Sequence, residues 1–91
     1  MIELFSSDTP NGKKVSIMLE EINLEYKVTK LDLSNGDQFK ADFKKISPFS
    51  KIPAIIDYSN NKEAIFESGA ILIYLAEKSK KFYDYSNKIK I

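Results

Sequence analysis

A proline stands at the start of an apolar run in the segment Lys51-Ile52-Pro53-Ala54. Proline at the first residue of a strand is compatible with a cis peptide bond in a tight turn. A cis bond would turn the Ile52 backbone outward, where its N–H and C=O could pair with an extended peptide as an added rung of antiparallel sheet. An ordinary trans proline entering an edge strand explains the same residues, because only about 5 to 6% of X-Pro bonds are cis. The segment alone leaves both interpretations open.

Glu67 and Ser68 stand where the last helix of the chain is expected to begin. The unsatisfied N–H groups and the dipole of a helix start, together with the Ser68 hydroxyl, favour a carboxylate. The Glu67 carboxylate beside them favours an ammonium group. A site that binds a carboxylate and an ammonium on neighbouring atoms suits the end group of an amino acid. The alternative is a serine N-cap next to an unrelated surface glutamate.

The segment Thr9-Pro10-Asn11-Gly12 stands at the expected start of the first helix. Thr9 or Asn11 could donate a hydrogen bond to an anion held in the field of the helix dipole. A thiolate bound there would be stabilised and the pKa of its thiol lowered, as for cysteines at helix N-termini. Threonine at the N-cap and proline at the first helical position explain the same residues without a ligand.

These segments lie at the ends of elements that the hydrophobic pattern predicts. Short apolar or alternating runs indicate strands, and apolar residues at i, i+3, i+4 and i+7 indicate amphipathic helices. The sequence between Ser34 and Pro48 is less regular and favours a short helix. The expected elements are, in order, strand 2–6, helix 13–22, strand 26–31, a short helix around 39–46, strand 53–58, strand 62–66 and a largely buried helix 69–78 capped by Ser68.

This order of elements predicts an α/β domain with a four-stranded mixed sheet and three helices. The first two strands should be parallel through a right-handed crossover, with the hairpin added to the same sheet. That is the thioredoxin-like βαβ-α-ββα topology. In it the first helix start, the residue before the third strand and the last helix start converge at one edge, so one extended peptide could touch all three.

Composition excludes several kinds of chemistry. The 91 residues suit one domain, and they include neither cysteine nor histidine, so the chain lacks a thiolate nucleophile and the commonest metal ligands. We therefore expect no metal site. The net charge is only +1 and all 14 basic residues are lysines, which argues against nucleic acid as a partner. The N-terminus has no basic leader and no apolar stretch is of bilayer length, so we expect no membrane contact and a cytoplasmic location.

Three segments together resemble a known family: Thr9-Pro10-Asn11-Gly12-Lys13-Lys14-Val15-Ser16-Ile17-Met18-Leu19-Glu20-Glu21, Lys51-Ile52-Pro53-Ala54-Ile55 and Phe66-Glu67-Ser68-Gly69-Ala70-Ile71. They are similar to the N-terminal domain of bacterial Nu-class glutathione transferases, the glutathione-dependent disulfide-bond oxidoreductases. They are also similar to the globular part of a yeast nitrogen-regulation prion protein. The resemblance runs from Ile2 to about Phe82.

The resemblance implies that glutathione is the ligand and that the Ile52-Pro53 bond is cis. The implied glutathione-binding residues are Gln38, Lys51, Ile52, Pro53, Glu67 and Ser68. Ile52 would pair with the cysteinyl backbone, while Glu67 and Ser68 hold the γ-glutamyl end. Thr9 and Asn11, the implied catalytic residues, would lie near the glutathione sulfur and polarise it. That sulfur would serve as the thiol that the chain lacks, attacking a small-molecule or protein disulfide before a second glutathione resolves the mixed disulfide.

The chain departs from the family pattern at two places. The loop Ser47-Pro48-Phe49-Ser50-Lys51 replaces the usual Asn-Pro-Asn-Gly-Lys, which alters the surroundings of the glycyl end of glutathione. Phe5 stands where relatives often carry tyrosine, so sulfur activation is left to Thr9 and Asn11.

We expect a glutathione-binding thioredoxin-like domain over residues 1–80, a lysine-rich C-terminal tail over 81–91, and no helical second domain of the kind that the family carries. Two hypotheses about function follow. The intact motifs favour an enzyme that uses glutathione to reduce disulfides or transfer thiols. The missing helical half favours a non-catalytic glutathione-binding or protein-interaction module, which pairs with itself as a homodimer or with another partner through an exposed apolar face.

Overall fold

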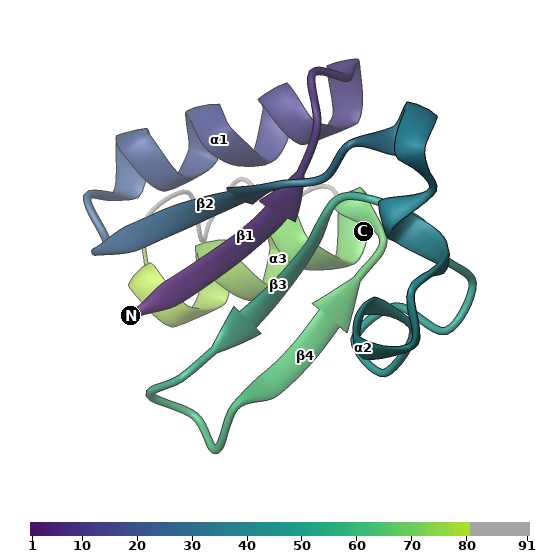
Figure 1. Ribbon diagram of the computed structural model, residues 1–91. Coiled ribbons are helices and arrows are strands. Elements are labelled where there is room, and N and C mark those ends of the chain that lie inside the picture. The colour runs from purple at the N-terminus through teal and green to yellow at the C-terminus, as the bar shows by residue number, and fades with distance from the viewer. Residues whose placement is uncertain (81–91) are drawn as a thin grey trace.

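The computed structural model describes residues 1–80, and the predicted tail over 81–91 lies outside the described residues. A four-stranded sheet with the strand order β2-β1-β3-β4 forms the centre of the fold (Figure 1). The strands are β1 (Ile2–Ser6), β2 (Tyr26–Lys30), β3 (Ala54–Asp57) and β4 (Glu63–Phe66). The helices in this part of the chain are α1 (Pro10–Ile22), α2 (Ala41–Lys44) and α3 (Ser68–Ser79), with 3₁₀ turns at Leu33–Asn35 and Asp37–Phe39.

The sheet is mixed, as the sequence predicts. β1 runs parallel to β2, to which α1 connects it, and antiparallel to β3. β3 and β4 form the predicted antiparallel hairpin. This is the expected thioredoxin-like arrangement. It places the end of β1, the start of β3 and the end of β4 at the same edge of the sheet (Figure 1).

α1 begins and ends at residues suited to helix termini. Thr9 is the N-cap, and its Oγ1 accepts a hydrogen bond from the Gly12 N–H at 3.1 Å. Pro10 occupies the first helical position, as the segment Thr9-Pro10-Asn11-Gly12 indicated, and the helix extends the apolar pattern from Lys13 by three residues. Asn23 ends the helix in the left-handed conformation, with φ of 58°. The buried stripe of the helix consists of Gly12, Val15, Leu19 and Ile22.

Apolar side chains cover both faces of the sheet. α1 and α3 pack together on one face, where the buried core consists of Ile2, Leu4, Val15, Leu19, Ile22, Ile55, Ile71 and Leu75. A smaller cluster beneath α2 occupies part of the other face and consists of Phe5, Leu31, Phe43 and Ala54. The rings of Phe5 and Phe43 lie 5.9 Å apart in this cluster. Neighbouring residues of β1 and β3 thus point to opposite faces, as strand geometry requires.

Two predictions about the last helix are wrong. α3 begins at Ser68 itself, Glu67 is the N-cap residue, and no side chain caps the helix. The helix is also buried on one side only, because Ile71, Leu75 and Ala76 are buried while Ile73 is 40% exposed. One face of α3 packs against α1 and the sheet, and residues 1–80 supply no layer to cover the other face. None of the helices within residues 1–80 combines the length and apolar character that crossing a bilayer requires.

Candidate functional site

The peptide bond between Ile52 and Pro53 is cis, as the family resemblance implied. Pro53 is buried and Ile52 is partly buried, directly before β3. Within residues 1–80, the N–H and C=O of Ile52 take part in no hydrogen bond. These two groups are therefore free to pair with the backbone of a ligand.

The loop before β3 is held by a buried serine. Ser47 is fully buried, and its Oγ donates to the Lys51 C=O at 2.8 Å and accepts from the Lys51 N–H at 3.2 Å. The Ser50 N–H donates to the Ser47 C=O at 2.9 Å, with Ser50 in the left-handed region at φ of 57°. Phe49 at the tip is 72% exposed, although its ring packs edge-on against Phe66. The sequence gives no sign of the bracing role of Ser47, because a serine before proline is common in exposed turns.

Glu67 and Ser68 lie at the junction between β4 and α3. Glu67 has a positive φ of 76°, which is uncommon for a residue other than glycine and is found preferentially at functional sites. The Glu67 C=O accepts a hydrogen bond from the Ile71 N–H at 2.9 Å. The Glu67 carboxylate and the Ser68 hydroxyl have no hydrogen bond or ion pair within residues 1–80. Both side chains are therefore available to a ligand.

The register of the sheet brings these segments together. Ala54 pairs with Phe66, so Pro53 and Glu67 leave the sheet next to each other. Ala54 also pairs with Phe5, so the loop between β1 and α1 begins at the same edge. The three predicted binding segments therefore converge on one edge of the sheet, where Figure 1 shows the ends of β1 and β4 beside the start of β3.

Thr9 and Asn11 lie at the start of α1. The predicted N-cap role of Thr9 is confirmed, since its Oγ1 accepts the Gly12 N–H. The hydroxyl proton of Thr9 remains available for donation to another group. The Asn11 side chain is exposed and makes no hydrogen bond within residues 1–80. Capping the helix and binding an anion are therefore compatible at this position.

Gln38 lies in the 3₁₀ turn before α2. Its Oε1 is buried and has no hydrogen-bond partner within residues 1–80. A buried polar atom without a partner costs roughly 1 to 3 kcal/mol, so a donor from a ligand would stabilise it. The turn is held in place by Asp37, whose Oδ2 accepts from the Asp32 N–H at 2.8 Å and whose Oδ1 lies 3.0 Å from Lys40 Nζ. Within residues 1–80, no group of three or more His, Cys, Asp or Glu side chains is arranged to hold a metal ion.

A second polar cluster, which no sequence pattern indicates, joins the β3–β4 turn to α3. Asp57 is fully buried at the end of β3. Its Oδ1 accepts from the Ser59 N–H at 3.0 Å and the Ser59 hydroxyl at 2.6 Å, while its Oδ2 accepts from the Tyr74 hydroxyl and lies 2.9 Å from Lys78 Nζ. Burial by itself raises the pKa of Asp57, but the hydrogen bonds from Ser59, Tyr74 and Lys78 outweigh burial and hold the pKa well below its ordinary value. The carboxylate is therefore ionised in the folded protein.

Glu3 forms a similar cluster on the other face of the sheet. Glu3 is 8% exposed, and its carboxylate accepts hydrogen bonds from the hydroxyls of Thr29 and Tyr58, with Lys27 Nζ at 3.9 Å. Burial raises the pKa of Glu3, whereas the hydrogen bonds with Thr29 and Tyr58 and the charge of Lys27 bring it below its ordinary value. This cluster joins β1, β2 and the end of β3.

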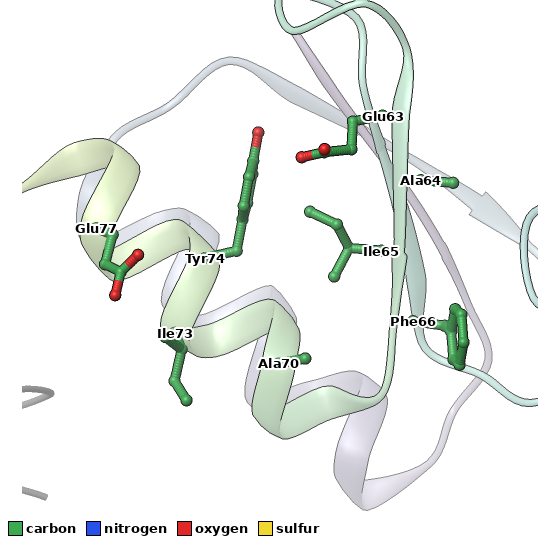
Figure 2. A pocket seen from close by; sticks show the side chains of 8 residues that line it. All are labelled: Glu63, Ala64, Ile65, Phe66, Ala70, Ile73, Tyr74 and Glu77. Atoms are coloured by element: carbon green, nitrogen blue, oxygen red, sulfur yellow. The ribbon is translucent and has the colours of Figure 1, made fainter. Parts of the chain in front are cut away.

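Figure 2 shows a groove between β4 and the outer side of α3. Its volume is about 530 Å³. Ile65 extends from β4 toward Tyr74 of α3, and Ala70 and Ile73 line the helical side. None of the predicted site residues lines this groove, although Phe66 and Ala70 in its lining flank Glu67 and Ser68 in the sequence.

The chain is similar to known proteins along most of its length. The family described as glutathione S-transferase, N-terminal domain, matches residues 2–77. Over 92 residues the chain is 47% identical to the disulfide-bond oxidoreductase YfcG of Escherichia coli (strain K12), covering 97% of the chain and 43% of that protein. Over 84 residues it is 46% identical to the disulfide-bond oxidoreductase YghU of the same organism, covering 85% of the chain and 29% of that protein. The chain spans less than half the length of these curated relatives.

Solved structures show the same likeness. A glutathione transferase family member from Pseudomonas fluorescens pf-5, crystallised with two glutathione bound, matches with a TM-score of 0.85 and 51% sequence identity. The match covers 89% of this chain and 37% of that chain. Ure2p in complex with glutathione matches with a TM-score of 0.85 and 37% sequence identity. This match covers 91% of this chain and 33% of that chain. The sheet and helices described above are therefore shared with proteins that bind glutathione.

Proposed function

Because this chain belongs to the glutathione S-transferase N-terminal domain family, we propose that it binds glutathione through Ile52, Glu67 and Ser68 and uses the bound thiol to reduce disulfides or transfer thiols. One observation carries the proposal. The backbone groups of Ile52, the Glu67 carboxylate and the Ser68 hydroxyl meet at one edge of the sheet without partners within residues 1–80. Unsatisfied polar groups of different kinds at one place favour a ligand that carries matching groups.

Glutathione carries the matching groups. Its γ-glutamyl end has an ammonium that pairs with Glu67, and a carboxylate that accepts from the Ser68 hydroxyl and the first N–H groups of α3. Its cysteinyl residue has one C=O and one N–H, which pair with the N–H and C=O of Ile52. The Gln38 amide and the exposed ammonium of Lys51 suit the remaining polar atoms, including the glycyl carboxylate.

Bound glutathione would supply the thiol chemistry that a chain without cysteine lacks. The residues of this chain lower the pKa of the bound thiol. The Thr9 hydroxyl and the Asn11 amide donate hydrogen bonds toward the sulfur, and the N-terminus of α1 favours negative charge there. Because the thiolate is the nucleophile in thiol–disulfide exchange, these contacts raise the reactive fraction at neutral pH. The second substrate is a small-molecule or protein disulfide.

A second candidate function is a glutathione-binding or protein-interaction module without catalysis. The observation that favours it is the groove between β4 and α3, where Ile73 is 40% exposed. Exposed apolar surface often marks an interface, and a homodimer would cover it. Sedimentation at several protein concentrations separates a monomer from such a dimer.

The first test is a titration of reduced glutathione into isotope-labelled protein. The signals to follow are the backbone amides of Asn11, Gln38, Ile52 and Ser68. We expect saturable shifts centred on these residues and no shift at Lys27, which lies at the opposite end of the sheet. The absence of shifts at millimolar glutathione would overturn the proposal. Binding without exchange of a small disulfide would favour the non-catalytic module.

A further inference from the structure

The start of α3 carries two of the proposed glutathione contacts: Glu67 directly follows β4, and Ser68 is the first residue of the helix, so its place depends on the direction of α3 relative to β4. No side chain caps the helix start. On the inner side, the helix is anchored by its buried residues, which are Ile71, Leu75 and Ala76. On the side that faces β4, Ile65 and Tyr74 are only partly buried where they pack against the core, and the groove of about 530 Å³ lies beside them (Figure 2). The apolar contacts on this side of α3 are therefore less buried than those on its inner side.

A polar clasp joins the end of β3 and the turn after it to the C-terminal half of α3. The Tyr74 hydroxyl donates to Asp57 Oδ2, and Lys78 Nζ lies 2.9 Å from the same oxygen. Asp57 is fully buried, and Ser59 satisfies its other oxygen. We call these residues, Asp57, Ser59, Tyr74 and Lys78, the Asp57 clasp. β4 runs from the Asp57 clasp to the proposed site, and α3 runs from the site back to the clasp. Residues of these two elements line the groove.

We propose that the Asp57 clasp positions Glu67 and Ser68 for glutathione by fixing the direction of α3 relative to β4, an inference that rests on the proposed function. An α-helix rises about 1.5 Å per residue, so Ser68 lies roughly 9 to 15 Å along the helix from Tyr74 and Lys78. A tilt of about 5° at the clasp moves the helix start by roughly 1 Å. A displacement of about 1 Å in a positioned group can lower function by up to about 100-fold. The clasp acts through Glu67 and Ser68 and does not touch the ligand.

The Glu3 cluster provides a matched control on the opposite face of the sheet. There, too, a buried carboxylate accepts a hydrogen bond from a tyrosine, Tyr58, and has a lysine nearby, Lys27 at 3.9 Å. The contacts of Glu3 within residues 1–80 involve no residue of α3. Opening this cluster should therefore lower stability without changing the direction of the helix.

The test compares two double variants of the full chain. Tyr74→Phe with Lys78→Met opens the clasp, and Tyr58→Phe with Lys27→Met opens the Glu3 cluster. Denaturant unfolding at several temperatures first identifies a temperature at which both variants are folded. We expect the clasp variant to shift the Ser68 amide signal in the free protein and to weaken glutathione binding by roughly 2- to 30-fold. The Glu3 variant should leave both unchanged.

A clasp variant that keeps the wild-type affinity and the wild-type Ser68 signal would overturn the inference, as would equal effects in both variants. The single variant Lys78→Arg, which keeps the charge beside Asp57, should bind glutathione like wild type. If the wild-type protein binds no glutathione, the proposed function fails by itself. In that case, comparing the Ser68 amide signal of the free clasp variant with that of the free wild-type protein still tests whether the clasp fixes the position of the start of α3.

Discussion

Ala54 and Phe66 are paired at the last rung between β3 and β4, and this pairing sets Pro53 beside Glu67. Strand register is fixed by the face that is buried, because a slip by one residue turns every side chain to the opposite face. A slip in this hairpin would separate the Ile52 backbone from the Glu67 carboxylate. The proposed glutathione site therefore depends on the hairpin register as much as on its side chains.

Replacing Glu67 with alanine should weaken glutathione binding by roughly 1.5 to 3 kcal/mol, because a charge-assisted hydrogen bond to the γ-glutamyl ammonium is lost. Titration calorimetry on the folded protein measures this change. Glu21→Ala is the matched control, since Glu21 is an exposed glutamate near the far end of α1. Wild-type affinity in the Glu67 variant would remove the γ-glutamyl assignment.

Thr9→Ala should leave glutathione binding nearly intact and slow exchange with a disulfide, because the Thr9 hydroxyl is proposed to stabilise the thiolate. It should also lower the free energy of unfolding by about 0.5 to 2 kcal/mol, since the Gly12 N–H loses its cap. Calorimetry and exchange rates on the folded variant separate the two effects. Thr9→Ser keeps the hydroxyl and should behave like wild type. An equal loss of binding and exchange would argue that Thr9 only shapes the pocket.

Local patterns in the sequence account for much of the fold. The spacing of Val15, Leu19 and Ile22 predicts α1, and the helix indeed buries these side chains. The short α2 was less distinct, because Phe43 is its only buried residue and packs against Phe5, far away in the sequence. Periodicity cannot reveal a helix that is held mainly by one aromatic contact.

The polar contacts could not be predicted, because they join residues that only the folded chain brings together. In the sequence, Asp57 is a polar residue near the end of a predicted strand. Nothing near it in the sequence indicates that Tyr74 and Lys78 contact its carboxylate. Ser68 was an expected N-cap because of its residue type. The backbone instead turns one residue earlier, at Glu67, which has no preference for a positive φ.

Ser50→Gly should stabilise the protein. Ser50 has φ of 57°, and a residue with a Cβ in this left-handed region costs roughly 1 to 2 kcal/mol. Glycine avoids that cost but loses more backbone entropy on folding, by about 0.5 to 1 kcal/mol. The free energy of unfolding should therefore rise by up to about 1.5 kcal/mol, seen in urea as a higher midpoint with an unchanged m value. Ser50→Ala keeps the Cβ and should give no such gain. An equal gain in both variants would contradict the explanation that Ser50 has a strained backbone.

Acid should destabilise the protein through Asp57. The pKa of Asp57 is lower in the folded protein than in the unfolded chain, where it is about 3.9. Its stabilising contribution is therefore present above the unfolded pKa and is lost as the pH falls toward the folded pKa. Asparagine does not titrate, so the difference in unfolding free energy between wild type and Asp57→Asn should be largest near neutral pH and shrink below about pH 4.

Denaturant unfolding of both proteins at a series of pH values measures this difference. Glu3, whose pKa is also lowered, is present in both proteins, so its contribution cancels. A difference that does not depend on pH would contradict a stabilising role for the ionised Asp57 carboxylate.

Gly12 and Gly69 both lie in helices, but alanine should have opposite effects at the two positions. A Cβ at Gly12 would lie 2.9 Å from the Ser7 C=O and would overlap Ser6 Oγ. A Cβ at Gly69 would meet nothing within 4 Å. Gly12→Ala should therefore lower the free energy of unfolding by roughly 1 to 3 kcal/mol through overpacking. Gly69→Ala should raise it by about 0.4 to 1 kcal/mol, because alanine reduces the entropy of the unfolded chain.

Chemical denaturation of the two single variants tests this contrast, and a third variant locates its cause. Ser6→Ala combined with Gly12→Ala removes the overlapping hydroxyl but leaves the Ser7 carbonyl, so it should recover only part of the lost stability. Full recovery would show that the Ser6 hydroxyl alone excludes a side chain at Gly12. An unchanged free energy of unfolding in Gly12→Ala would contradict the prediction. It would mean that the loop between β1 and α1, which carries Thr9, shifts to make room for the added methyl group.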